Sequence, residues 1–192
     1  MQETVDTTLG GVPIRLSSPW VFFAITFAIT WGFWLPAMVM GLTFDSALGL
    51  GFLLIGLTGP GIAGVGLMSL LYDEESRSDF WDRVTNPRRI AGRWYLAIFL
   101  YPPLTFAVAA VADILLGGQG YTVGAWVPQL TSNPAAFLPT LLFSSLPPVL
   151  EELGWRGYAL DQLQRTRSAL AAGLILGVVW AVWHLPLFLI GG

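Results

Sequence analysis

Long apolar stretches without charged side chains alternate along the chain with short segments that carry charge. A helix of roughly 20 apolar residues spans the hydrocarbon core of a bilayer. The stretches run from 16 to 44, 47 to 72, 94 to 112, 114 to 150 and 168 to 192, the fourth being partly loop. They lack the period-2 alternation of a membrane β-barrel. Because only helices and closed barrels satisfy the backbone in lipid, the pattern predicts five spanning helices.

The composition agrees with this pattern, since 55% of the 192 residues are hydrophobic and 11% are charged. A soluble domain carries about 25% charged residues. We therefore expect an all-α fold, a polytopic helical bundle in the cell membrane. Residues 1–18 would form an N-terminal tail and residues 19–192 the transmembrane domain. Glu3 and Asp6 precede the first basic residue, Arg15, which is unlike a signal peptide and favours a retained first helix.

The basic residues are all arginines and are unevenly placed. Two connections between the expected helices carry most of them: Arg77, Arg83, Arg88, Arg89 and Arg93 in the second, and Arg165 and Arg167 in the fourth. By the positive-inside rule these connections and the N-terminus are cytoplasmic. The net charge is −3 and no basic stripe is present, so no nucleic-acid partner is expected.

The cytoplasmic connection, residues 73–93, places Phe80, Trp81 and Val84 at helical spacing before the helix breaker Asn86-Pro87. This spacing suits a short amphipathic helix at the membrane interface. A solvated loop with aromatic anchors fits equally well.

Two groups of small residues predict close helix packing. The second apolar stretch carries Gly56, Gly59, Pro60, Gly61, Gly64 and Gly66 close together. Packing is the simpler interpretation of these glycines, and a direct role in ligand binding is the alternative. In the last stretch, Gly173, Gly177 and Ala181 recur every four residues, which predicts a packing face with His184 on or beside it.

Three charges follow the fourth apolar stretch, in the sequence PPVLEELGWRGYAL. Glu151 and Glu152 are adjacent, so on a helix they face different directions. Glu152 and Arg156 are four residues apart, the spacing at which opposite charges meet on one face. Arg156 would then neutralise Glu152 and leave Glu151 for a substrate or a water. Pro147-Pro148 would release carbonyls and bend the helix at this point.

His184 is the only histidine of the chain. If the last two helices form a hairpin that turns near Thr166, Glu151 lies at the depth of Val182. His184 is then within about 3 Å of that depth, at 1.5 Å of rise per residue. The alternatives are an interfacial salt-bridge cluster and a structural histidine beside tryptophan. Fifteen residues separate Glu151 from the turn, which favours burial, and an ionisable residue inside a membrane indicates function.

The available side chains restrict the chemistry. The chain has no cysteine and no HExxH zinc motif. Catalytic zinc needs three protein ligands, for which Glu151, Glu152 and His184 are the candidates in a zinc alternative. General acid–base hydrolysis fits better: a carboxylate activates a water, and the imidazole stabilises or protonates the developing tetrahedral oxygen.

These motifs resemble those of the CPBP family of intramembrane endopeptidases, the CAAX protease and bacteriocin-processing (ABI) family. EELGWR is similar to its EExxxR motif, and WAVWH to its aromatic-x-x-x-His motif. The resemblance implies that Glu151 activates water, that His184 assists at the reaction centre, and that Glu152 and Arg156 support them. It implies no obligatory metal, and it places an incomplete catalytic core at residues 135–192. The family has a further His-x-x-x-Asn-type motif on a later helix, so we expect a chain truncated relative to the family fold.

Three functions remain open from the sequence. The first is an intramembrane endopeptidase whose partners are the lipid bilayer and a membrane-associated protein or peptide substrate. The second is a non-catalytic membrane protein of the same fold, with a bacteriocin-immunity or scaffold role. The third, a transporter with a proton relay through Glu151 and Glu152, does not explain the pairing of EExxxR with a histidine.

Overall fold

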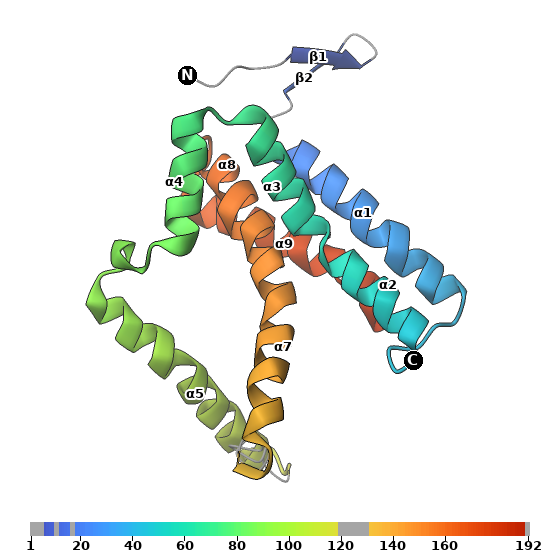
Figure 1. Cartoon of the computed structure of the whole chain (residues 1–192), viewed down its shortest axis with the longest axis vertical. Coiled ribbons are helices and arrows are strands. Elements are labelled where there is room, and N and C mark those ends of the chain that lie inside the picture. Colours follow the sequence, from blue (N-terminus) through green and yellow to red (C-terminus); the bar gives the residue numbers. More distant parts are fainter. Residues whose placement is uncertain (1–5, 10–11, 16–17, 119–130, 191–192) are drawn as a thin grey trace. The chain divides into compact units, whose positions relative to one another are not determined.

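The computed structural model describes residues 6–9, 12–15, 18–118 and 131–190, and most of this part is helical (Figure 1). Strands β1 (Asp6–Leu9) and β2 (Val12–Arg15) form a short antiparallel hairpin. The longer helices are α1 (Pro19–Val39), α2 (Ala47–Leu57), α3 (Gly59–Leu71), α4 (Glu74–Thr85), α5 (Gly92–Leu115), α7 (Pro134–Gly154) and α9 (Ala169–Trp183). The shorter helical segments are η1 (Pro87–Arg89), η2 (Trp155–Ala159), α8 (Leu160–Gln164) and η3 (Leu185–Phe188).

The prediction of a helical membrane protein is confirmed. Among the described residues, three helical segments are long and apolar enough to cross a membrane: α1, the continuous segment from α2 to α3, and α5. The fourth expected stretch contains α7, and the fifth contains α9, a shorter apolar helix. Residues 119–130, in the expected outer connection, lie outside the described residues. The side of the membrane on which the N-terminus lies stays a prediction.

Proline divides the second apolar stretch into two helices at Thr58. Pro60 has no backbone N–H, so it cannot donate to the carbonyl of Gly56, four residues earlier. The hydroxyl of Thr30 on α1 donates to that carbonyl instead, at 2.8 Å. The side chain that replaces the missing donor therefore also joins α1 to the junction between α2 and α3.

The chain forms two compact units, residues 1–84 with 144–192 and residues 85–143. In the first unit α1 packs on α2 and α3, α3 packs on η2, and α8 packs on α9. Its core is aromatic: Phe22, Trp34, Trp155, Tyr158 and Trp183 are fully buried. The ring of Trp155 meets those of Phe22 and Trp183 edge-on, with centroids 5.3 and 5.7 Å apart. Burial of such large side chains is the main source of stability for a small core.

The second unit contains η1, α5 and the first residues of α7. Helix α5 continues through Pro102 and Pro103, so these two prolines do not interrupt it. Near its start the hydroxyl of Tyr95 donates to the carbonyl of Pro87 at 2.7 Å, which ties η1 to α5.

Gly59, Gly61 and Gly64 of α3 pack as expected, whereas nothing lies within 4 Å of a Cβ added at Gly66. A Cβ atom added at Gly61 would lie 2.8 Å from the carbonyl oxygen of Leu150, and one at Gly64 would lie 2.7 Å from the Cα of Gly154. One at Gly154 would collide with the carbonyl of Pro60. Glycine on both helices thus lets the backbones of α3 and α7 touch, directly beside Glu151 and Glu152.

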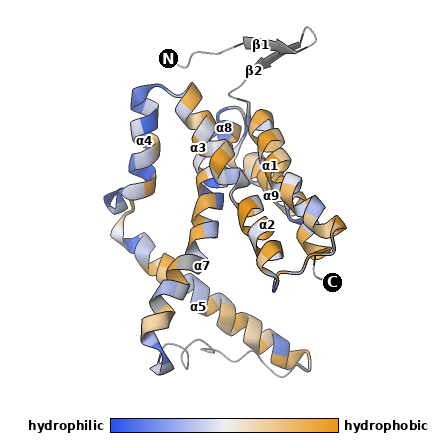
Figure 2. Ribbon diagram, turned by 45° about the vertical axis from the view of Figure 1, so that its right-hand side comes forward, coloured by the Kyte–Doolittle hydropathy of each residue, from blue (hydrophilic) through white to orange (hydrophobic). Residues whose placement is uncertain are grey.

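Residues 74–85 of the arginine-bearing connection form helix α4 rather than a loop. Figure 2 shows α4 as mostly hydrophilic, unlike α1, α2 and α3. Phe80 is buried, and its ring would be 3.0 Å from a Cβ added at Gly157 of η2. Trp81 is 42% exposed and meets Phe80 edge-on. Phe80 therefore anchors α4 to the segment that follows the two glutamates.

Candidate active site

The motif EELGWR crosses the end of α7 and the start of a π-helical turn. Helix α7 includes Pro147-Pro148 and both glutamates and ends at Gly154. In η2 the backbone N–H of Leu160 donates to the carbonyl of Trp155, five residues earlier. Such π turns insert one extra residue into a helix and occur frequently at functional sites. The sequence does not indicate this turn, because the apolar spacing of Trp155, Tyr158 and Ala159 is also that of an ordinary helix.

The two glutamates have different partners, as their spacing predicts. Nη1 of Arg156 lies 2.6 Å from Oε1 of Glu152, and both side chains are about half exposed. Glu151 is half-buried, and its carboxylate lies near the side chain of Trp180. Glu151 thus points toward α9, while Glu152 is paired on its own helix.

The position of His184 follows from the end of α9. Pro186 cannot continue the helix, so α9 ends at Trp183 and His184 is its C-cap. The backbone N–H of His184 donates to Ala181, three residues earlier. The carbonyl of Trp180 accordingly accepts a hydrogen bond from Nδ1 of His184, 2.9 Å away. A carbonyl only accepts, so Nδ1 carries the proton and Nε2 is the ring nitrogen left for other chemistry.

Aromatic rings hold His184 from two sides. The rings of Trp180 and Trp183 meet the imidazole edge-on, with centroids 4.3 and 4.5 Å away. The carbonyl of Trp183 accepts a hydrogen bond from the indole of Trp31 on α1, at 3.0 Å. The end of α9, where the histidine lies, is therefore fixed to α1.

The hairpin geometry brings Glu151 and His184 to one level. The chain turns between Gln164, the end of α8, and Ala169, the start of α9, which agrees with the expected turn near Thr166. The carboxylate of Glu151 lies near the side chain of Trp180, one helical turn before His184. His184 contacts the carbonyl of the same residue. In the sequence, Trp180 is distinguished only as the aromatic residue of WAVWH, four residues before His184.

The prediction of a small-residue packing face on α9 is wrong within the compact unit that contains this helix. Gly173, Gly177 and Ala181 are exposed, and no heavy atom lies within 4 Å of a Cβ added at either glycine. The packed face carries Ala172, Leu176 and Trp183 instead. Core contact in α9 thus comes from a large indole and apolar side chains rather than from close backbone approach.

Within the described residues, no group of three His, Asp or Glu side chains is arranged to hold a metal ion. The zinc alternative, with Glu151, Glu152 and His184 as ligands, therefore has no assembled ligand set in this geometry. The pairing of Glu152 with Arg156 explains this, because it holds that carboxylate on its own helix.

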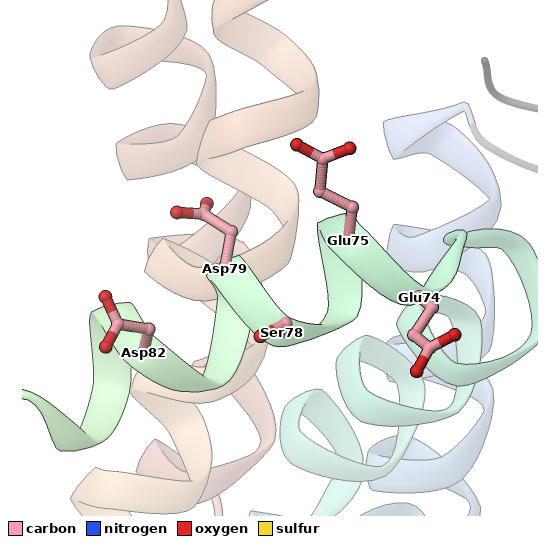
Figure 3. A pocket seen from close by; sticks show the side chains of 5 residues that line it. All are labelled: Glu74, Glu75, Ser78, Asp79 and Asp82. Carbon is pink, nitrogen blue, oxygen red and sulfur yellow. The ribbon is translucent and has the colours of Figure 1, made fainter.

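A separate group of acidic residues lies on α4. Glu74, Glu75, Ser78, Asp79 and Asp82 line a shallow depression there, with the acidic side chains fanning out from the helix (Figure 3). Asp79 pairs with Arg83 at 3.1 Å. Most of this group is exposed. It is the solvated face of the helix whose other side carries Phe80.

Comparison with known proteins supports the motif assignment. Residues 133–191 match the family model described as Type II CAAX prenyl endopeptidase Rce1-like. The chain is 31% identical over 179 residues, 90% of its length, to CAAX prenyl protease 2 of Methanococcus maripaludis. The chain spans 64% of the length of that relative. The two matches confirm the resemblance seen in the motifs: residues 133–191 are similar to the Rce1-like type II CAAX prenyl endopeptidases.

Proposed function

We propose that the chain carries the catalytic centre of a membrane-embedded endopeptidase that hydrolyses a peptide bond of a membrane-associated protein or peptide. The single observation that carries this proposal is that Glu151, near the side chain of Trp180, and His184, bonded to the carbonyl of Trp180, lie at one level of the hairpin. A carboxylate and an imidazole at one level of a helical bundle are the two groups that water activation and proton return require. The family match and the name of the archaeal relative point to the same reaction.

In the proposed mechanism Glu151 accepts a proton from a water whose oxygen attacks the scissile carbonyl carbon. The tetrahedral oxygen that forms is stabilised by His184, whose Nε2 is directed away from its own backbone contact. Cleavage of the C–N bond returns the proton to the leaving amine, and a carboxylate and an amine are the products. Glu152 and Arg156 act as a neutral pair that keeps a second full negative charge away from Glu151. The proposal requires no metal ion and no other cofactor.

The test uses the membrane protein reconstituted in liposomes, with a farnesylated peptide that ends in a CAAX-type tetrapeptide as the probe. Glu151→Gln and His184→Ala should each lower the rate of release of the C-terminal tripeptide at least 100-fold, as measured by mass spectrometry. Asp161→Asn, on the same hairpin, is the matched control for loss of a carboxylate and should retain cleavage. Thermal unfolding in detergent verifies that the variants are folded.

Two outcomes would contradict the proposal. If Glu151→Gln cleaves like the unmodified protein, the carboxylate does not activate water, and a non-catalytic role of the same fold gains support. If the unmodified protein leaves the farnesylated peptide intact, prenylated peptides are excluded as the substrate class. Retention of cleavage after exhaustive chelation is expected.

A further inference from the structure

The last carbonyl groups of α9 have no donor within their own helix, as at every helix end. The side chain of His184 bonds one of them, the carbonyl of Trp180, through Nδ1 at 2.9 Å. The carbonyl of Trp183, the residue directly before the histidine, would in a continuing helix accept from the backbone N–H of Leu187. That N–H donates instead to the carbonyl of His184, at 2.9 Å, because the chain tightens into η3. The Trp183 carbonyl therefore needs a donor from another part of the chain.

This donor comes from α1, 152 residues earlier in the sequence. The indole Nε1 of Trp31 donates to the Trp183 carbonyl at 3.0 Å, and the bond is partly buried. The ring of Trp31 also packs on Phe27 of its own helix, with centroids 5.0 Å apart. The carbonyl that it bonds belongs to the peptide group that joins Trp183 to His184. The orientation of this peptide group sets the direction in which the histidine side chain leaves the backbone.

We propose that Trp31 is a positioning residue of this centre: by holding the peptide group before His184, it keeps Nδ1 of the imidazole on the Trp180 carbonyl and Nε2 directed away from the backbone. This inference rests on the proposed function, in which His184 takes part in the reaction. Trp31 acts through the backbone of α9 rather than on the reacting atoms. The constraint is in place before substrate binds, so the imidazole needs no rearrangement in the transition state.

Trp34, one turn further along α1, supplies a matched control. Its indole also donates to a backbone carbonyl, that of Leu53 on α2, at 3.2 Å. Its ring also packs on Trp183, with centroids 4.8 Å apart, but it meets the side chain and not the peptide group. Phenylalanine at either position removes one indole N–H from the same helix. Since Trp34 is fully buried and Trp31 only partly, the change at 34 should cost more stability, and only the change at 31 releases the peptide group before His184.

The first experiment measures steady-state cleavage of the farnesylated peptide by Trp31→Phe and Trp34→Phe in liposomes, per folded protein, beside thermal unfolding in detergent. A misplacement of about 1 Å at a reacting group can lower the rate about 100-fold. Trp31→Phe should therefore lower kcat about tenfold or more and change KM less than about threefold, because positioning acts after binding. Trp34→Phe should lower the unfolding midpoint further and yet keep kcat within about threefold. Values of kcat that follow the unfolding midpoint in the two variants would overturn the proposal.

The analogue 3-benzothienylalanine at position 31 separates the hydrogen bond from the shape of the ring. It replaces the indole N–H by sulfur and keeps both rings, so the packing on Phe27 is retained and the protein folds even where phenylalanine at 31 prevents folding. It should lower kcat as Trp31→Phe does. Cleavage equal to that of the unmodified protein would show that the ring of Trp31 matters and its bond does not, which would overturn the proposal.

The second experiment does not depend on activity and uses the single histidine of the chain. ¹⁵N labelling of histidine gives one imidazole, whose neutral form should be protonated at Nδ1 because that atom faces the Trp180 carbonyl. Trp31→Phe should move part of the population to protonation at Nε2, because the released ring can leave that carbonyl, whereas Trp34→Phe should not. An unchanged tautomer in Trp31→Phe would overturn the proposal. A changed tautomer, with an unmodified protein that cleaves no peptide, would support the positioning of His184 and contradict only the proposed function.

Discussion

The hairpin from α7 to α9 carries two arginine–carboxylate pairs with the same four-residue spacing but different surroundings. Glu152–Arg156 is about half exposed, 2.6 Å long, and adjacent to Glu151. Asp161–Arg165, 3.1 Å long, lies nearer the turn, where the carboxylate also accepts from Arg83 on α4 at 3.3 Å. The local motif is therefore the same, and only the neighbours separate a candidate catalytic pair from a structural one.

The pair near the turn belongs to a set of mutually bonded side chains that we term the turn cluster: Tyr72, Arg83, Asp161, Gln162 and Arg165. Gln162 is buried and donates to the Tyr72 hydroxyl at 2.9 Å. That hydroxyl donates to Asp161 at 3.4 Å, and the Arg165 guanidinium lies 5.7 Å from the centre of the Tyr72 ring. Burial and, to a lesser extent, Asp161 raise the pKa of Tyr72, so its hydroxyl stays protonated and donates. The cluster joins α3, α4 and α8.

The Glu152–Arg156 pair lies beside Glu151, whose carboxylate lies near the side chain of Trp180 on α9. Opposite charges at helical spacing therefore do not distinguish a candidate catalytic pair from a structural pair. A carboxylate bonded to several basic and polar side chains stabilises the fold. A carboxylate that lies near a neutral indole keeps its capacity to accept a proton.

The largest expected effect comes from Gly154→Ala, which alters the backbone between Glu152 and Arg156. The new Cβ would collide with the carbonyl of Pro60, a backbone atom that cannot move without moving α3. Overpacking of this kind costs about 1–3 kcal/mol of unfolding free energy. We expect a lower midpoint of thermal unfolding in detergent and a loss of cleavage with it.

Gly173→Ala is the matched control for the change at position 154. Nothing lies within 4 Å of a Cβ at Gly173, and alanine favours a helix by up to about 1 kcal/mol over glycine. The midpoint should stay unchanged or rise slightly. If both variants lower the unfolding midpoint equally, the contact between α3 and α7 at Gly154 does not fix the segment that carries Glu152 and Arg156.

Tyr72→Phe should have the next largest effect, on stability alone. Removal of the hydroxyl leaves the buried amide of Gln162 without its acceptor, which costs about 1–3 kcal/mol. Thermal unfolding checks the loss, and kcat for the folded protein should be unchanged. Tyr95→Phe, which removes an exposed hydroxyl bonded to Pro87, should cost less. A fall in kcat with Tyr72→Phe would show that the turn cluster contributes to the reaction.

The sequence alone predicted the helical membrane fold, the hairpin turn near Thr166 and the Glu152–Arg156 pair. These predictions succeeded because apolar length and four-residue spacing are local properties of the chain. The glycines of α3 and those of α9 looked alike in the sequence. Only the former lie at backbone contacts, because facing Gly154 on α7 makes close approach possible.

The π turn and the approach of Trp180 to Glu151 depend on tertiary contacts that spacing does not record. The π turn from Trp155 to Ala159 follows the glycine contact at Gly154 and contains Tyr158, whose burial requires packing against α1 and α3. Trp180 and Glu151 belong to two helices, so the approach of their side chains follows from the relative rotation of those helices. A single sequence fixes the depth of a helical residue through the turn, but it does not fix that rotation.

The smallest expected change in stability is also the sharpest test of the comparison: Arg156→Gln against Arg165→Gln. Both variants remove one partly exposed ion pair of the same spacing, which contributes about 0.2–1 kcal/mol at most. Their thermal midpoints should therefore be nearly equal. Under the proposed function, Arg156→Gln leaves Glu152 unneutralised beside Glu151 and should lower kcat about tenfold or more, whereas Arg165→Gln should not. If both arginines prove equally dispensable for cleavage, Glu152 and Arg156 form a surface pair like the other one. The centre would then consist of Glu151 and His184 alone, and the four-residue spacing that the two pairs share would reflect helix stability rather than chemistry.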